Sequence, residues 1–141
     1  PLAKKLSAKK LHFLSLSIGG IGLLCIPFLN DVDILFTLPF GNGIDISQIY
    51  LFSFGLGITW ASMMAMPYQM LASSIPQGKT GIYMGIFNMF IVVPMIIQIF
   101  SVQYLVYDLL DQNPINIIRL AGIFLIIGGL FSLFVSQPKT N

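Results

Sequence analysis

The feature that most constrains the fold of this chain is a set of four long runs with almost no charged side chains. They cover residues 11–29, 46–75, 81–107 and 115–135, and only the last contains a basic residue, Arg119, near its start. Each run reaches the roughly 20 residues that a helix needs to cross a bilayer core of about 30 Å. Helices are expected because lipid offers no partners to free backbone groups, and the strict alternation of a membrane β-strand is absent.

The composition places these runs in a membrane protein. Charged residues make up 9% of the chain and hydrophobic residues 56%, and the mean hydropathy is +0.89. About a quarter of the residues of a soluble domain are charged, so this chain lacks the side chains to cover a surface that faces water. We therefore predict an all-α integral membrane protein in which residues 1–141 form one transmembrane bundle, with helices over about residues 11–29, 48–75, 81–107 and 115–136.

The start of the chain allows two further interpretations. The first residue is Pro1, which leads us to expect a fragment or a processed product. The lysines before the first run also resemble the beginning of a signal peptide. However, the run is long for a signal peptide, and the segment "PFLND" lacks the small residues of a cleavage site.

The charged side chains sort onto two sides of the membrane. With four crossings, one side receives all the lysines, which are Lys4, Lys5, Lys9, Lys10, Lys79 and Lys139. The other side receives all the acidic residues, which are Asp31, Asp33, Asp45, Asp108 and Asp111. Because basic loops stay in the cytoplasm, we predict a cell-membrane protein with both ends of this chain cytoplasmic. Arg119 breaks the pattern, and we expect it to reach the outer interface or to pair with Asp108 or Asp111.

The second run has no face suited to lipid alone. On a helical wheel one stripe carries Gly55, Thr59, Ser62, Met66, Gln69 and Ser73, and the opposite stripe carries Ser53, Gly57, Trp60, Met64 and Tyr68. Small and polar side chains on two sides indicate that protein or a cavity surrounds this helix. Pro67 removes one backbone hydrogen bond and is expected to bend the helix. Only one stripe can face a solute pathway squarely, and the aromatic stripe is our preferred candidate.

The other three runs carry fewer polar groups. The third run holds Asn88, Gln98 and, at mid-membrane, Pro94, where we expect a second bend. An amide inside a membrane needs a partner, so Asn88 is expected to be hydrogen-bonded. Small residues for helix packing occur in the first run as Ser15, Gly19 and Gly22, and in the fourth run as Ala121, Leu125, Gly128 and Ser132, with Gly122 and Gly129 beside them.

Six residues of the two middle runs are candidates for contact with a solute: Trp60, Met64, Tyr68, Gln69, Asn88 and Gln98. Amides that donate and accept hydrogen bonds, next to an aromatic platform, suit a neutral hydroxylated solute such as a sugar. The same side chains also suit hydrogen bonds between helices together with aromatic packing, and the sequence leaves both interpretations open. Pro67 and Pro94 are the candidate bending or gating positions.

Nothing in the sequence supports catalysis. The membrane runs lack Asp and Glu, the single His12 is expected at the cytoplasmic edge, and no Ser–His pair, metal-ligand spacing or phosphate loop is visible. We therefore predict no enzyme, no metal and no cofactor. Cys25, the only cysteine, lies in an apolar run, as packing residues do, and a net charge of +2 is too small to suggest nucleic acid as a partner. If transport is coupled to protons, the titrating group is expected outside this chain.

The stretch "GITWASMMAMPYQMLASSIPQGKTGIYMGIFNMFIVVP" (residues 57–94) resembles the major facilitator superfamily. It is most similar to the branch of sucrose and related glycoside transporters, the solute carrier 45-like and glycoside–pentoside–hexuronide symporters. In that branch a helix with the pattern "WAS…PY.ML" precedes a short loop and then "G.YMGIFN.F…P". The match is specific in these two runs, whereas the first and fourth agree with the family mainly in hydropathy.

The resemblance implies that the four runs are the ninth to twelfth helices of a twelve-helix secondary transporter, which carries a sugar with a proton or sodium ion by alternating access. The tenth and eleventh helices of that fold line or gate the cavity, and the ninth and twelfth support them. Two positions depart from the family. Its cytoplasmic loop motif is degenerate here, with Lys4 in place of an acid and Ser7 and Ala8 in place of Gly and Arg, and Met95 stands where glutamine is frequent.

On this interpretation the chain requires the preceding helices of the same protein and does not transport by itself. Two alternatives remain open. One is a facilitator of another small solute, which uptake by the full-length protein would identify. The other is a stand-alone four-helix membrane subunit that scaffolds a partner, which the coding sequence before Pro1 would separate from a transporter.

Overall fold

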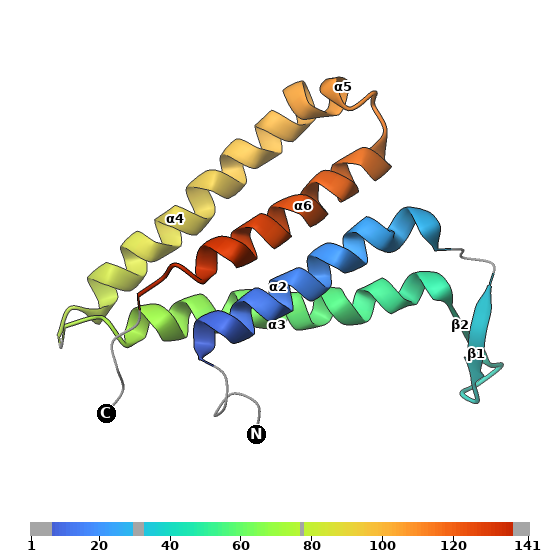
Figure 1. Cartoon of the computed structure of the whole chain (residues 1–141), viewed down its shortest axis with the longest axis horizontal. Helices are drawn as coiled ribbons and strands as arrows, with labels where there is room; N and C mark the ends of the chain where they lie inside the picture. Colours follow the sequence, from blue (N-terminus) through green and yellow to red (C-terminus); the bar gives the residue numbers. More distant parts are fainter. Residues whose placement is uncertain (1–6, 30–32, 77, 137–141) are drawn as a thin grey trace.

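The computed structural model describes residues 7–29, 33–76 and 78–136. Four long helices dominate this part of the chain: α2 (Ala8–Cys25), α3 (Leu51–Ala72), α4 (Thr80–Ser101) and α6 (Pro114–Ser132) (Figure 1). With their short helical extensions they form four segments long and apolar enough to cross a membrane: Ala8–Phe28, Gln48–Ala72, Thr80–Leu109 and Pro114–Ser132. The prediction of four helices long and apolar enough to span a membrane is confirmed.

Short elements extend three of these helices. The 3-10 turn η1 (Ile26–Phe28) continues α2, and the 3-10 turn η2 (Gln48–Tyr50) leads into α3. At its end α4 passes into one π-helical stretch, η3 (Val102–Val106), and then into the single turn α5 (Tyr107–Leu109). Such π-helical turns are rare and occur frequently at functional sites. The sequence did not lead us to predict this π-helical stretch.

A β-hairpin connects α2 to α3, so the expectation of a purely helical chain is wrong in this segment. Strand β1 (Ile34–Leu38) pairs antiparallel with β2 (Ile44–Ser47), and Phe36 lies opposite Ile46. β-branched and aromatic residues favour strands, and the turn contains Gly41 and Gly43 with φ of 61° and 89°, where glycine carries no steric cost. Residues 30–47 are rich in the turn residues Asn, Asp, Gly and Pro, which favour an irregular connector, whereas most of the apolar residues among them lie in the strands.

Helix α2 is the centre of the packed part of the molecule, with α3 on one side and α6 on the other (Figure 1). Small residues permit this. Gly19 lies against the side chain of Thr59, and Gly20 faces Gly122 so closely that a Cβ on Gly122 would lie 2.8 Å from the Gly20 carbonyl oxygen. The α6 surface that contacts α2 contains Gly122 and Gly129. A Cβ on Gly128 would meet nothing within 4 Å, so Gly128 is not part of this surface. The sequence predicted Gly128 in the packing surface with Gly122 and Gly129 beside it, and at these glycines the prediction is wrong by one position.

The described lysines and acidic residues lie toward opposite ends of the molecule, as predicted. The beginning of α2, the α3–α4 turn and the end of α6 lie at one end of the molecule, and the hairpin and the α5–α6 turn lie at the other (Figure 1). The Lys9 ammonium donates to the carbonyl oxygens of Leu133 and Val135, both at 3.2 Å, and so joins α2 to the end of α6. Four of the predicted charges lie outside the described residues, namely Lys4, Lys5, Asp31 and Lys139.

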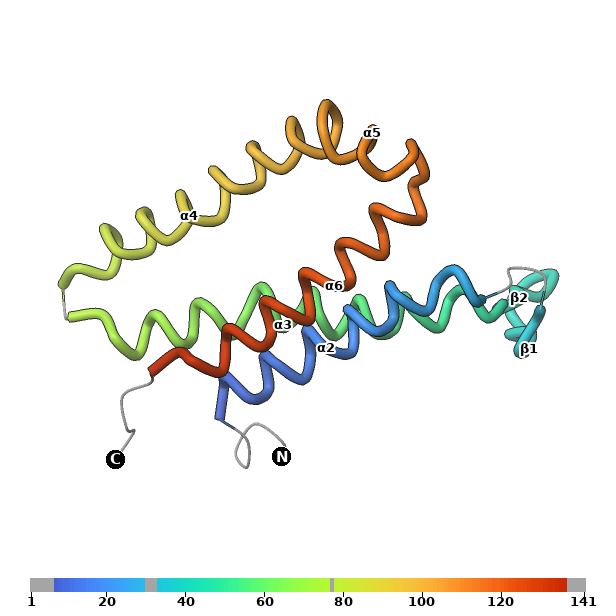
Figure 2. The backbone as a smooth tube through the Cα atoms, turned by 45° about the horizontal axis from the view of Figure 1, so that its top comes forward, coloured from blue at the N-terminus to red at the C-terminus, as the bar shows by residue number. Residues whose placement is uncertain are grey.

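Helix α4 stands apart from the other three. None of its residues is buried, and it has few contacts with α2, α3 or α6. Figure 2 shows it curving away between the turn that follows α3 and the turn that precedes α6. Helix α3, which the sequence predicts to be surrounded by protein or by a cavity, is buried on one face among the described residues, and α4 is buried on none. The space beside α4 contains the candidate site.

Candidate solute site

The structure shows which stripe of α3 packs against its neighbour. The Thr59 hydroxyl donates to the Ser15 carbonyl oxygen at 2.6 Å, and the Ser62 oxygen lies 2.9 Å from Nδ1 of His12. Gly55, on the same stripe, lies against Ile18 of α2. All three α3 residues are buried. The stripe of α3 that carries Thr59 and Ser62, which we call the hydroxyl stripe, is therefore a helix-packing surface. Its hydrogen bonds join α2 to α3.

The opposite, aromatic stripe is left open by the described residues. Trp60 is 66% exposed and Met64 is 48% exposed. The Trp60 ring borders a surface hollow of about 400 Å³ together with Met63 and with Leu125 of α6. The stripe that we preferred as a candidate on the sequence is thus the one that α2 does not cover.

A cavity of about 340 Å³ lies among all four helices, and we call it the four-helix cavity. Its lining residues are His12 and Leu16 from α2, Met63, Met64 and Pro67 from α3, Phe87 and Ile91 from α4, and Phe124, Leu125 and Gly128 from α6. Small-molecule sites are mostly apolar hollows of this order of size with a few placed polar groups. The lining has this character, because His12 is its one polar side chain.

Next to this cavity, one hydrogen bond joins two of the predicted site residues. The Tyr68 hydroxyl donates to Oδ1 of Asn88 at 2.6 Å, and the Tyr68 ring meets Phe87 edge-to-face with centroids 5.1 Å apart. The expectation that Asn88 is hydrogen-bonded is confirmed. Hydrogen bonds between membrane helices contribute about 0.6 kcal/mol on average, so this contact holds α3 to α4 only weakly.

Gln98 belongs to a second hollow, of about 520 Å³, between the end of α4 and α6. The second hollow also includes Val102 and Val106 of the π-helical turn, and it shares Phe124 and Leu125 with the four-helix cavity. The two spaces are therefore neighbours along α6. Met64 lines the first, Gln98 lines the second, and Trp60 faces the separate hollow beside them.

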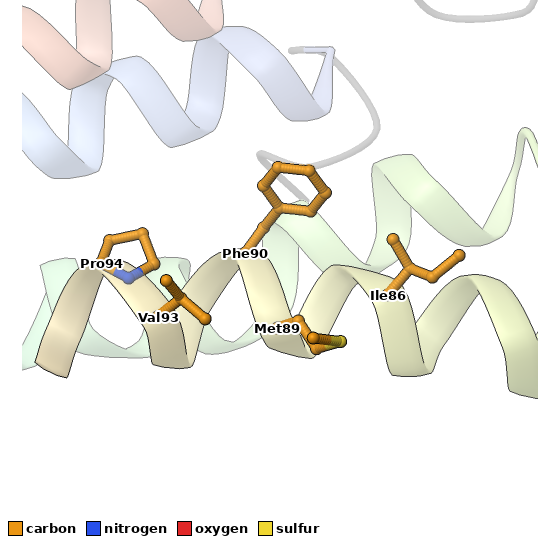
Figure 3. A pocket seen from close by; sticks show the side chains of 5 residues that line it. All are labelled: Ile86, Met89, Phe90, Val93 and Pro94. Atoms are coloured by element: carbon orange, nitrogen blue, oxygen red, sulfur yellow. The ribbon is translucent and has the colours of Figure 1, made fainter.

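The remaining candidates occupy other positions. Gln69 is exposed and contributes to neither of these two cavities. Pro67 and Pro94 lie inside α3 and α4 without ending either helix, and each leaves the carbonyl four residues earlier without its usual donor. Pro94 borders a hollow of about 490 Å³ whose lining, Ile86, Met89, Phe90 and Val93, comes from α4 alone (Figure 3). A hollow formed by one helix is an uncovered surface.

The sequence did not lead us to predict the His12–Ser62 pair, and of the two expectations for Arg119 the pairing with Asp108 or Asp111 is wrong. His12 and Ser62 are 50 residues apart, so only the packing of α2 against α3 brings them together. Two signals in the sequence could have indicated it: a histidine at the start of the first membrane helix, and a stripe of hydroxyl side chains on the second. Among the described residues, Arg119 donates to Oδ1 of Asn116 at 3.2 Å, and no ion pair with Asp108 or Asp111 is present.

Comparisons with models of known protein families, with curated proteins and with solved structures each find no match. Function is therefore inferred from the residues of this chain and from their geometry. The relevant geometry is an apolar cavity beside a loosely held helix, with one histidine in its wall and a Tyr–Asn hydrogen bond at its border.

Proposed function

We propose that this chain is the C-terminal part of a secondary transporter of the major facilitator type, which carries a small neutral solute such as a sugar across the cell membrane. The observation that carries the proposal is the Tyr68–Asn88 hydrogen bond at the border of the four-helix cavity, since it joins α3 to the otherwise unpacked α4. The resemblance of residues 57–94 to sucrose and glycoside transporters covers these two helices and supports the same function.

The chemistry of the open stripe suits a hydroxylated solute. Sugar hydroxyls both donate and accept hydrogen bonds, and the amides of Asn88 and Gln98 can do the same in return. The exposed ring of Trp60 offers a flat apolar surface for the C–H face of a sugar ring. These three side chains lie on the parts of α3 and α4 that α2 leaves uncovered, where a solute can reach them.

Alternating access supplies the mechanism. In this class of transporter one bundle rocks against another around a site near the middle of the membrane. We assign to Tyr68 and Asn88 a closing contact, formed when α4 lies against α3 and broken when α4 swings away. Pro67 and Pro94, together with the π-helical turn at Val102–Val106, are the positions where these helices can bend without losing further hydrogen bonds.

The uncovered surface of α4 supports the presence of further helices around it. Helix α4 is apolar over most of its circumference but carries the amides Asn88 and Gln98. Such a helix is better suited to a larger bundle than to lipid on every side. The same surface is compatible with a second function, a four-helix subunit that scaffolds another membrane protein. The two functions differ in whether solute crosses the membrane.

Uptake of radiolabelled sucrose and maltose by cells that express the full-length protein tests the proposal. We expect saturable uptake. We expect Asn88→Ala to weaken it by about threefold to about twentyfold, the range that corresponds to one lost membrane hydrogen bond, and we expect Trp60→Ala to weaken it through loss of the apolar ring surface. Ser73→Ala is the matched control, because its hydroxyl is exposed and bonds only to the carbonyl of Met70 in its own helix.

The possible outcomes separate the alternatives. Transport of another solute without sucrose or maltose would identify a facilitator of that solute. Full uptake in both variants, at unchanged expression, would remove Trp60 and Asn88 from the site. Absence of uptake for any solute, together with stable recovery of a partner membrane protein, would favour the scaffold.

A further inference from the structure

The four-helix cavity contains the only histidine of the chain. His12 is 8% exposed, and it lies on the first turns of α2, where Ser62 of α3 contacts its Nδ1 at 2.9 Å. Because Nδ1 is engaged with Ser62, Nε2 is the ring nitrogen that remains for a partner in the cavity, whose wall includes His12. This position gives an apolar hollow one group that can take up and release a proton.

No other described titratable group shares the wall of this cavity. The α3, α4 and α6 residues that line it are all apolar. Lys9 and Lys10 are the neighbouring charges on α2 itself, and the Lys9 ammonium is turned to the end of α6, where it bonds to two carbonyl oxygens. Tyr68, next to Pro67, directs its hydroxyl to Asn88. Among the described residues, His12 is therefore the group through which a proton can act on the contents of the cavity.

We propose that His12 is the proton-binding residue of the four-helix cavity and that its protonation is coupled to solute movement. The coupling role depends on the proposed transport function, whereas proton binding by His12 in the cavity does not. The assignment replaces our expectation that a coupling group lies outside this chain. It names the proton, and not sodium, as the coupling ion.

The Ser62 hydroxyl can hydrogen-bond Nδ1 in both protonation states of the His12 ring. When the ring is neutral, the serine hydroxyl either donates to a bare Nδ1 or accepts from Nδ1–H, since a hydroxyl can do both. When a proton from water binds Nε2, the ring becomes a cation, Nδ1–H donates to the Ser62 oxygen, and Nε2–H is directed at the cavity. A solute hydroxyl oxygen there accepts a charge-assisted hydrogen bond, and it loses that bond when the proton leaves to water on the other side.

Ring NMR on the 141-residue chain in lipid nanodiscs tests proton binding directly. The chain contains one histidine, so selective ¹³C and ¹⁵N labelling of its ring gives one unambiguous set of signals. We expect a reversible titration of the His12 ring over the pH range in which the nanodiscs stay intact. We expect Ser62→Ala to shift the Nδ1 signal while the titration persists. A ring whose signals do not change over this range would overturn the proposal.

Uptake by the full-length protein tests the coupling. We expect solute accumulation to be driven by an inward proton gradient, and we expect His12→Gln to lose this accumulation while keeping solute exchange at equal pH on both sides. Ser73→Ala is the matched control, which leaves both His12 and Ser62 in place and is expected to retain proton-driven accumulation.

The outcomes distinguish the two proposals. If the wild-type protein transports but His12→Gln still accumulates solute with the proton gradient, the coupling role of His12 is wrong and the transport function stands. Accumulation driven by sodium alone would refute it equally. If the wild-type protein carries no solute, the transport function fails and the coupling role fails with it, and the NMR titration then decides whether His12 binds a proton in the cavity.

Discussion

The contact between Gly20 and Gly122 predicts a large difference between two glycine replacements in one helix. In Gly122→Ala the new methyl group would lie 2.8 Å from the backbone carbonyl oxygen of Gly20 and 3.1 Å from the side chain of Leu24. Normal contacts between such atoms are about 3.5 to about 4.0 Å, so α6 must move away from α2. In Gly128→Ala the methyl group meets nothing within 4 Å.

The two replacements share two contributions to the free energy of unfolding, and these cancel when the variants are compared. Both remove the helix penalty of glycine, up to about 1 kcal/mol, and they add the same methyl group to α6. The difference between them is therefore the steric term, and a methyl group forced into a packed contact costs about 1 to about 3 kcal/mol. We expect Gly122→Ala to have a free energy of unfolding lower than that of Gly128→Ala by this amount.

Reversible unfolding in mixed micelles, followed by far-ultraviolet circular dichroism as the fraction of denaturing detergent increases, measures this difference. The wild-type chain provides the reference. Equal stability of the two variants would refute the packing of α2 against α6 described above, and so would a variant Gly128→Ala less stable than Gly122→Ala.

Three further outcomes are expected. Thr59→Val should lose about 0.6 to about 1.7 kcal/mol of unfolding free energy in the same titration, because its hydroxyl is the donor to the Ser15 carbonyl; an unchanged midpoint would contradict this contact. A double-mutant cycle of Tyr68→Phe and Asn88→Ala should show a coupling energy of about 0.6 kcal/mol, and additive effects would mean that the hydrogen bond contributes nothing. Gly43→Ala, at a φ of 89°, should destabilise the hairpin by about 1 to about 2 kcal/mol and speed amide exchange in β1, and unaltered exchange there would argue against this turn.

The helices were predictable because each physical signal for them is local. Twenty apolar residues in a row can satisfy their backbone in lipid only as a helix, and the turn residues between the runs mark where each helix ends. The hairpin was not predictable with the same ease, because residues 34–47 are few and their strand propensity competes with Gly and Asn signals for an irregular loop. Which glycines face a neighbour depends on helix rotation, and this explains the error at Gly128.

The candidate site was predictable in part. The helical wheel separated the hydroxyl stripe of α3 from the aromatic stripe, but the wheel alone could not say which one packs. The structure assigns Thr59 and Ser62 to packing against α2. The meeting of Tyr68 with Asn88 requires the α3–α4 turn to fold back, and the meeting of His12 with Ser62 requires α2 to lie across α3. Contacts of this kind depend on tertiary packing, which a single sequence does not contain.

Cysteine accessibility along α3 tests most directly the claim that the aromatic stripe lines a water-filled solute pathway. In the full-length protein, with Cys25 replaced by Ser in a background free of other cysteines, Met64→Cys and Ser62→Cys place one thiol on each stripe. We expect a water-soluble thiol reagent to label Met64→Cys and solute to slow this labelling, and we expect Ser62→Cys to stay unlabelled because α2 covers it. Rapid labelling of Ser62→Cys with none of Met64→Cys would contradict the account.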